Sequence, residues 1–136
     1  MMEKIMLCPD RIRKIAGTFG FIEHRFLKDG FFYSLTHHEL LLYLFLVLAA
    51  DRDGLSFYGY DRICTFLKIT LDEYILARNA LIDYDMIAFD GYLFQVLSLP
   101  EEVTRPVSKT LKSQEQMEKH DPATIRQLTL DAFWKK

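Results

Sequence analysis

The chain has 136 residues, of which 50% are hydrophobic, 14% aromatic and 26% charged, and its formal net charge at pH 7 is −2. This length and composition are typical of one globular domain with its own core and an additional segment. The longest apolar run, residues 40–50, contains 11 residues and is too short for a membrane-spanning helix.

The N-terminal residues bear on where in the cell the protein is located. The sequence MMEKIMLCPDRIRK lacks the basic start and the apolar stretch of a signal peptide, so we expect a cytoplasmic protein with no membrane association. In that compartment Cys8 and Cys64 are expected to be reduced thiols. Cys64 lies within an apolar helical pattern, which predicts a buried thiol.

The charges are distributed unevenly along the chain. Residues 1–35 carry six Lys or Arg and four Asp or Glu, residues 36–99 carry four and nine, and residues 100–136 carry seven and six. The central segment is therefore distinctly acidic, which bears on any contact with nucleic acid.

The central segment begins with a well-marked helix. Thr36 and Glu39 form a capping box, in which the two residues satisfy each other's unpaired backbone amides. The helix is apolar on nearly all sides, so we expect it to be buried at the centre and to end at Asp53-Gly54. Residues 55–58 alternate and predict a short strand, and residues 60–68 predict a second, shorter helix.

A third helix follows. The capping box Thr70-Leu71-Asp72-Glu73 starts it, and we expect it to continue to about Tyr84. Asp85 stands where a left-handed residue is needed to end the helix, a conformation that Asp tolerates better than most residues. The apolar stripe of this helix consists of Tyr74, Ala77, Leu81 and Ile82.

A hairpin comes directly after the third helix. Residues 86–89 and 92–99 predict its two strands, and Asp90-Gly91 between them predicts a two-residue turn. We expect the first of these strands to pair with the strand at 55–58 and to close the core. Two helices joined by a short turn and followed by a hairpin predict a helix-turn-helix with a wing.

The predicted fold class is therefore mainly α with a small β-sheet, a winged helix-turn-helix with an N-terminal helical arm and a C-terminal helix. The arm contains Phe21, Ile22, Arg25 and Phe26 at helical spacing, and Gly30 is expected to end that helix. The predicted units are an arm at 1–35, a winged-helix domain at 36–99, a polar linker at 100–121 and a C-terminal amphipathic helix at 122–136.

The stretch from Thr36 to Leu99 resembles bacterial winged-helix domains. The likeness rests on "LLLYLFLVLAADRDGLSFY", on the helix-to-strand junction "YILARNALIDYDMIAF" and on "YLFQVLSL". The stretch is most similar to small helix-turn-helix proteins carried near transposase or integrase genes, and to the N-terminal domains of DnaD-type replication-initiation proteins. The segment "FIEHRFLKDG" is similar to the lead-in of the first group.

The resemblance implies a DNA-binding protein, either a regulator of transcription or an accessory factor in DNA replication or in a mobile element. It implies that the third helix enters the major groove, that the wing contacts adjacent backbone, and that the protein forms a homodimer. A fold of this kind serves many functions, so the function has to be argued from the individual residues.

The outward side of the third helix is the expected groove-contacting surface. Asn79 suits adenine, whereas the acidic residues would be repelled by phosphates. Arg78 is the one basic residue of this helix, and an ion pair with a neighbouring acid is an equal alternative for it. The outward positions are Asp72, Glu73, Leu76, Asn79, Ala80 and Asp83. The candidate DNA-binding residues are Asn79, Arg78, Arg62, Lys68, Tyr58, Tyr60, Arg11, Arg13 and Lys14.

Each residue type has its own role in this hypothesis. Asn79 and Arg78 would contact base edges, the other basic residues would hold phosphates, and the two tyrosines would donate hydrogen bonds to phosphates. The alternative for both tyrosines is a packing role in the core or at its rim. The alternative for the whole protein is a protein-interaction or dimerisation module without DNA binding. The aromatic N-terminal segment and the C-terminal helix with its Trp134 would then supply apolar anchors for docking.

The sequence does not predict an enzyme, a metal site or a cofactor. His37 and His38 are adjacent, so on a helix their side chains diverge and do not converge on one ion. Cys8 and Cys64 do not have metal-site spacing. The glycines do not form a phosphate-binding loop, and we find no catalytic constellation.

Overall fold

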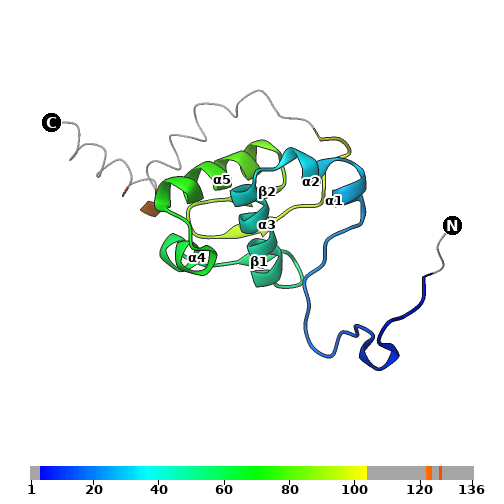
Figure 1. Ribbon diagram of the computed structural model, residues 1–136. Helices are drawn as coiled ribbons and strands as arrows, with labels where there is room; N and C mark the ends of the chain where they lie inside the picture. The colour runs from blue at the N-terminus through cyan, green and yellow to red at the C-terminus, as the bar shows by residue number, and fades with distance from the viewer. Residues whose placement is uncertain (1–3, 104–121, 124–125, 127–136) are drawn as a thin grey trace.

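The computed structural model describes residues 4–103, 122–123 and 126. In this part of the chain, five α-helices pack with one antiparallel sheet of three short strands (Figure 1). The coarse prediction of a mainly helical fold with a small sheet is therefore confirmed. The helices are α1 (Arg25–Lys28), α2 (Phe31–Ser34), α3 (His37–Ala49), α4 (Tyr60–Leu67) and α5 (Leu71–Asp83), the strands are β1 (Leu55–Ser56), β2 (Ile87–Phe89) and β3 (Phe94–Val96), and η1 (Pro9–Arg11) is a 3₁₀ turn.

The two predicted capping boxes begin α3 and α5. The Thr36 hydroxyl accepts from the Glu39 amide at 3.3 Å, and Glu39 Oε1 accepts from the Thr36 amide at 3.1 Å. Thr70 and Glu73 make the same reciprocal pair at 3.1 and 2.8 Å. Each box satisfies amides that the first helical turn leaves unpaired, so the sequence locates both helix starts.

The end of α5 sets the position of the hairpin. Asp85 has a φ of +61°, which confirms the left-handed residue predicted there. The Met86 amide donates to the Leu81 carbonyl at 3.1 Å and the Asp85 amide donates to the Ile82 carbonyl at 3.0 Å. These two bonds form a Schellman motif, which reverses the chain and starts β2 without a linker.

The sheet has the strand order β1-β3-β2, so the predicted pairing of the first hairpin strand with residues 55–58 is wrong. Strand β3 lies in the centre, where Gln95 pairs with Leu55 on one side and with Ala88 on the other. The reason is that β2 directly follows α5, and the Leu97 amide, just after β3, donates a hydrogen bond to the Met86 carbonyl at 3.0 Å. The returning strand, β3, is therefore the one that reaches β1.

The hairpin tip also differs from its prediction by one residue. The Asp90 amide donates to the Leu93 carbonyl at 3.3 Å, which leaves Gly91 and Tyr92 as the two residues of the turn. Gly91 has a φ of +106°, a conformation for which glycine is suited. The Asp90 carboxylate accepts from the Leu93 and Tyr92 amides at 2.7 and 2.9 Å, and these bonds lower the pKa of that carboxyl.

The core lies between α3, α5 and the sheet. Leu42, Leu46 and Leu81 are fully buried there, and the apolar stripe predicted for α5 is confirmed. Tyr43 stacks on the ring of Phe26 at a centroid distance of 5.0 Å, so α1 packs on the same core. Within the residues that the structure describes, no helix is long and apolar enough to cross a membrane.

Helix α3 differs from the prediction of a fully buried helix. Its inner side is buried, but the outward residues Leu41, Leu44 and Leu48 are 41%, 46% and 67% exposed. The reason is that the structure places the core on only one side of this helix. Helix α3 also ends at Ala49, before the predicted stop, and Gly54 lies in the loop that follows with a φ of +86°.

The predicted N-terminal helix is only partly present. Helix α1 begins at Arg25, Gly30 connects it to α2 with a φ of +91°, and Phe21 and Ile22 lie outside any helix. Gly30 therefore joins two short helices instead of ending one long helix. Residues 4–18 leave the helical body and extend away from it, as the blue segment of Figure 1 shows.

The predicted linker and C-terminal helix lie mostly outside the described residues. Pro122, Ala123 and Arg126 are described, and all three are helical. Ala123 is fully buried in the core cluster, and Arg126 Nη1 donates to the Tyr60 hydroxyl at 3.3 Å.

Candidate functional site

The outward side of α5 was the predicted groove-contacting surface. Asp72 is exposed, Leu76 is 71% exposed, and Asp83 is half-buried. Ala80, predicted to face outward, is buried, and the Glu73 carboxylate caps the helix start and lies 3.3 Å from His38. Arg78 is the one basic residue of α5, and it points inward, as described next. The outward side of α5 is therefore acidic, which is unfavourable beside phosphates.

Arg78 lies inside the protein. Its side chain is fully buried, with the guanidinium carbon 5.5 Å from the ring centre of Tyr74 and 5.1 Å from that of Phe89. Its Nε and Nη2 donate to Asn79 Oδ1 at 3.3 and 3.1 Å. These aromatic and hydrogen-bond contacts compensate a buried charge, and they hold the guanidinium away from the outward side of α5, where the groove contact is predicted.

Asn79 is half-buried beside Arg78. Recognition of adenine uses the amide oxygen and nitrogen of an asparagine together, on the two polar atoms of one base edge. In this structure the amide oxygen accepts both hydrogen bonds from Arg78. The two residues assigned to base contacts are thus brought together, but they contact one another inside the protein.

The basic residues assigned to phosphates are exposed but do not form one surface. Arg62 lies on α4 with its guanidinium carbon 5.0 Å from the Tyr58 ring centre, and Lys68 ends α4 with a φ of +57°. Arg11, Arg13 and Lys14 lie in the extended N-terminal segment, which Figure 1 shows well separated from α4. The structure therefore places the candidate phosphate contacts in two separate groups.

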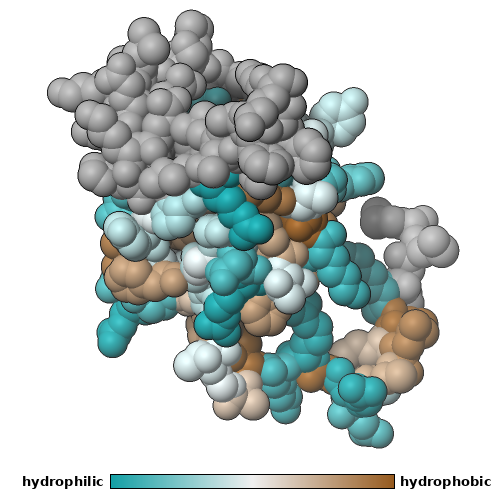
Figure 2. Space-filling view, turned by 90° about the vertical axis from the view of Figure 1, so that its left-hand side faces the viewer, coloured by the Kyte–Doolittle hydropathy of each residue, from teal (hydrophilic) through white to brown (hydrophobic). Residues whose placement is uncertain are grey.

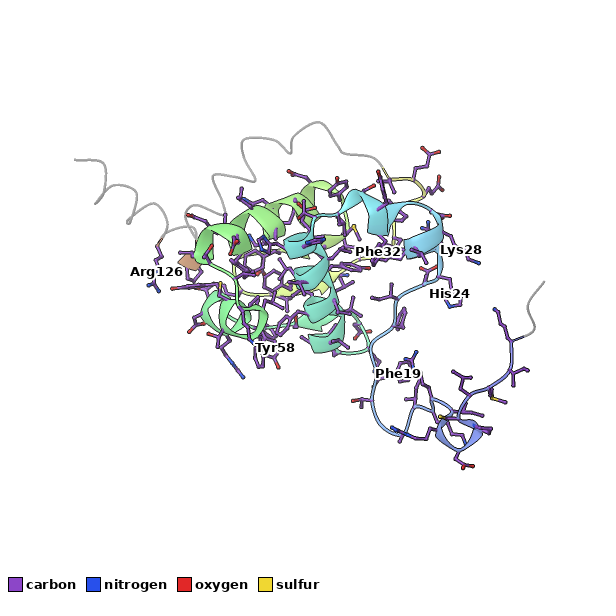
Figure 3. The ribbon with its side chains drawn as sticks, in the orientation of Figure 1. Phe19, His24, Lys28, Phe32, Tyr58 and Arg126 are labelled. Atoms are coloured by element: carbon purple, nitrogen blue, oxygen red, sulfur yellow. The ribbon has the colours of Figure 1, made fainter. Side chains whose placement is uncertain are left out.

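The two candidate tyrosines are half-buried around α4 (Tyr58 is labelled in Figure 3). Tyr58 packs edge-on against Phe45 at 5.1 Å and against Phe66 at 6.3 Å. The Tyr60 hydroxyl accepts a hydrogen bond from Arg126, and this bond raises the pKa of the Arg126 guanidinium. Both tyrosines also pack against the core, which is the alternative role given for them above.

An apolar surface that the sequence pattern did not indicate lies over α3 and α4. Leu41, Leu44 and Leu48 follow one another at intervals of three and four residues and line one side of α3. Phe45 lies one turn from both Leu41 and Leu48, and the Phe66 ring of α4 packs against it at 5.5 Å. We call the exposed set Leu41, Leu44, Leu48 and Phe66 the outer face; Phe66 is 58% exposed.

The root of the N-terminal segment borders the outer face. A Cβ atom on Gly20 would lie 2.5 Å from the Val47 carbonyl oxygen, so only glycine allows the chain to approach α3 this closely. The neighbours Phe19 and Phe21 are 63% and 73% exposed, and Figure 3 shows Phe19 where the segment leaves the body. The sequence did contain a signal for this surface. The helix at α3 is apolar on all sides, and a small domain can cover only one side of such a helix.

A hollow of about 270 Å³ lies between residues 19–23 and the loop at 50–54. Tyr43 and Val47 form part of its lining, and burial together with the nearby Glu23 raises the pKa of the Tyr43 hydroxyl. Most of the exposed lining is apolar, but Glu23, Asp51, Arg52 and Asp53 also border the hollow and give its rim a mixed charge.

The remaining chemistry of the described residues is limited. Among residues 4–103, 122–123 and 126, no three His, Cys, Asp or Glu side chains come together as a metal site. Cys64, predicted to be buried, is half-buried, and its desolvation together with nearby Asp61 raises the pKa of its thiol. Comparisons of the chain with protein-family models, with curated proteins and with solved structures found no match.

Proposed function

We propose that this chain is a winged-helix protein that binds another protein through the outer face of α3 and α4. The winged-helix assignment is supported by the order of elements, in which α4, a short turn and α5 are followed by the β2–β3 hairpin with β1 beside β3. In this arrangement α5 corresponds to the helix that other winged helices place in the major groove.

The exposed leucines and phenylalanine of the outer face carry the proposal. Leu48 and Phe66 are 67% and 58% exposed, and Leu41 and Leu44 are 41% and 46% exposed. Single exposed apolar residues are ordinary, but adjacent ones on neighbouring helices mark a surface that another protein covers. Burying such side chains contributes roughly 25 cal/mol per Å² of apolar surface removed from water.

The opposite assignment, a groove-contacting α5, has weaker support. Its outward side presents Asp72, Leu76 and Asp83, and Arg78 is enclosed by aromatic rings. Carboxylates close to phosphates are repelled, and an arginine on the inner side supplies no groove contact. The protein-interaction role, the alternative drawn from the sequence, is therefore the one that the geometry favours.

Binding of duplex DNA is the second candidate function, and a specific observation favours it. Arg62, Lys68 and the N-terminal candidates Arg11, Arg13 and Lys14 are all exposed. Backbone contacts alone supply non-specific affinity that falls steeply with salt. In this form of the proposal α4 and the N-terminal segment, and not α5, would hold the duplex.

Two matched leucine substitutions test the principal proposal. Leu48 on α3 and Leu76 on α5 are 67% and 71% exposed, and both belong to helices of 13 residues. We expect Leu48→Glu to reduce the recovery of bound protein at least about tenfold when the tagged chain is purified from its own cells, since a charge in an apolar interface is costly. We expect Leu76→Glu to leave that recovery unchanged. Loss of partners with Leu76→Glu alone would contradict the proposal.

A further inference from the structure

We infer that the partner of the outer face is a second copy of this chain, and that the N-terminal arm, residues 4–18, of each copy lies across the outer face of the other. The inference rests on the proposed function and names the partner of the same surface. One chain carries two exposed apolar surfaces: the outer face on the body, and an arm outside the body that is both apolar and basic.

The arm carries apolar side chains that nothing in the described structure covers. Ile5, Leu7 and Ile15 are 77%, 94% and 66% exposed, and Ile12 is 52% exposed. Figure 2 shows brown and tan residues in this projecting part, at the lower right beside the grey N-terminal end. An extended segment that contains this many large apolar residues gains free energy when it is laid on an apolar surface.

The arm does not lie on the outer face of its own chain. Its root is fixed beside α3, where Gly20 abuts Val47, and the chain beyond that point turns away from the body (Figure 1). Leu7 and Leu48 of one copy are 94% and 67% exposed, so neither side chain is covered by the other part. The arm is therefore free to reach another molecule.

The arm is basic, whereas the residues that flank the outer face carry a small excess of acids. The arm contains Lys4, Arg11, Arg13 and Lys14 against a single acid, Asp10. Residues 36–99 contain nine acids against four bases, and the acids Asp51, Asp53 and Asp61 stand at the end of α3 and at the start of α4, with Arg52 and Arg62 next to them. Opposite net charges orient the arm on the body and strengthen the encounter at low salt.

The dimensions fit an exchange between two copies. Fifteen extended residues span up to about 50 Å, whereas a helix of the length of α3 is about 20 Å long, so an arm can reach and cross the helix of a partner. Two copies that exchange arms form a closed, two-fold arrangement in which each contact occurs twice. In such a dimer each arm and each outer face has a counterpart.

Sedimentation velocity of the full chain between about 1 and 100 µM tests the inference. We expect the wild type to form dimers at the upper concentrations. Leu48→Glu, and separately the arm variant Arg13→Glu with Lys14→Glu, should each raise the dimer dissociation constant at least about tenfold. Leu76→Glu and Lys28→Glu serve as matched controls on exposed positions outside the two surfaces and should leave the constant unchanged.

A mixture of the two variants gives a signature specific to arm exchange. A Leu48→Glu chain keeps its arm and an arm variant keeps its face, so the mixed pair retains one of the two contacts and should dimerise more strongly than either variant alone. At concentrations low enough for every variant to be monomeric, circular dichroism should show the same melting temperature for all of them, because the substituted side chains are exposed.

Three results would overturn the inference. These are a monomeric wild type at every concentration, a dimer that the arm variant leaves intact, and a mixture no stronger than its components. If the chain is monomeric but Leu48→Glu still loses its cellular partner, the proposed function stands and only the identity of the partner is wrong. If Leu76→Glu dissociates the dimer and Leu48→Glu does not, both proposals fail.

Discussion

Replacing Arg78 by alanine is expected to lower the free energy of unfolding by about 3 kcal/mol, a loss typical of truncating a large, fully buried side chain. The substitution removes the guanidinium from between Tyr74 and Phe89 and leaves a cavity between α5 and the hairpin. It also removes the two hydrogen bonds that Asn79 Oδ1 accepts. Urea denaturation followed by circular dichroism measures the change.

Arg62→Ala is the matched control for this experiment. Arg62 also stacks on a tyrosine, with its guanidinium carbon 5.0 Å from the Tyr58 ring centre, but it is exposed. An exposed cation–π contact contributes less than about 1 kcal/mol, so the control should change stability little. An Arg78→Ala protein that is as stable as the wild type but has lost affinity for duplex DNA would restore the groove-contacting role of this residue.

Gly54→Ala is expected to lower the free energy of unfolding by about 2 to 4 kcal/mol, since it combines an unfavourable backbone conformation with a steric conflict. Gly54 has a φ of +86°, and a Cβ atom there would lie 2.7 Å from the Val96 carbonyl oxygen. The Val96 amide donates to the Gly54 carbonyl at 2.8 Å, so relief of the conflict would pull β3 away from the α3–β1 loop. Thermal and urea denaturation both report this loss.

Gly17→Ala separates this effect from a general cost of replacing glycine. A Cβ atom on Gly17 would meet nothing within 4 Å, and Gly17 lies in the arm, outside the core. We expect a change within about 0.5 kcal/mol. Equal destabilisation by the two substitutions would mean that the loop between α3 and β1 does not pack against β3 as described.

Local sequence signals located the starts of α3 and α5 and the end of α5 with little help from tertiary structure. Both capping boxes consist of residues three positions apart, and the left-handed Asp85 depends on its own turn, so neighbouring residues suffice to define them. The inward stripe of α5 followed from its helical spacing. These features are short-range, which is why the sequence predicted them.

The direction of single polar side chains was beyond the reach of helical spacing. Arg78 lies between inward and outward positions on α5, and its burial depends on Phe89, a residue of the hairpin whose position follows from the packing of the sheet. The strand order was missed for a related reason. Alternation identifies strands but does not indicate which strand of a hairpin lies next to β1.

The outer face was missed because composition does not indicate how much of an apolar helix the rest of the chain can cover. Eleven consecutive apolar residues, 40–50, predicted full burial, whereas the core covers only the side that carries Leu42 and Leu46. The excess of apolar residues on α3 is therefore informative in its own right. It indicates a surface that a second protein completes, which is the basis of the proposed function.

Site-specific photo-cross-linking tests the central claim most directly. A photoreactive phenylalanine derivative placed at Leu48, and in a matched strain at Leu76, samples the outer face and the outward side of α5 at nearly equal exposure, 67% and 71%. We expect the Leu48 position to give protein cross-links in cells and the Leu76 position to give none. Cross-links to DNA from the Leu76 position, with no protein cross-links from Leu48, would contradict the account and return the function to α5.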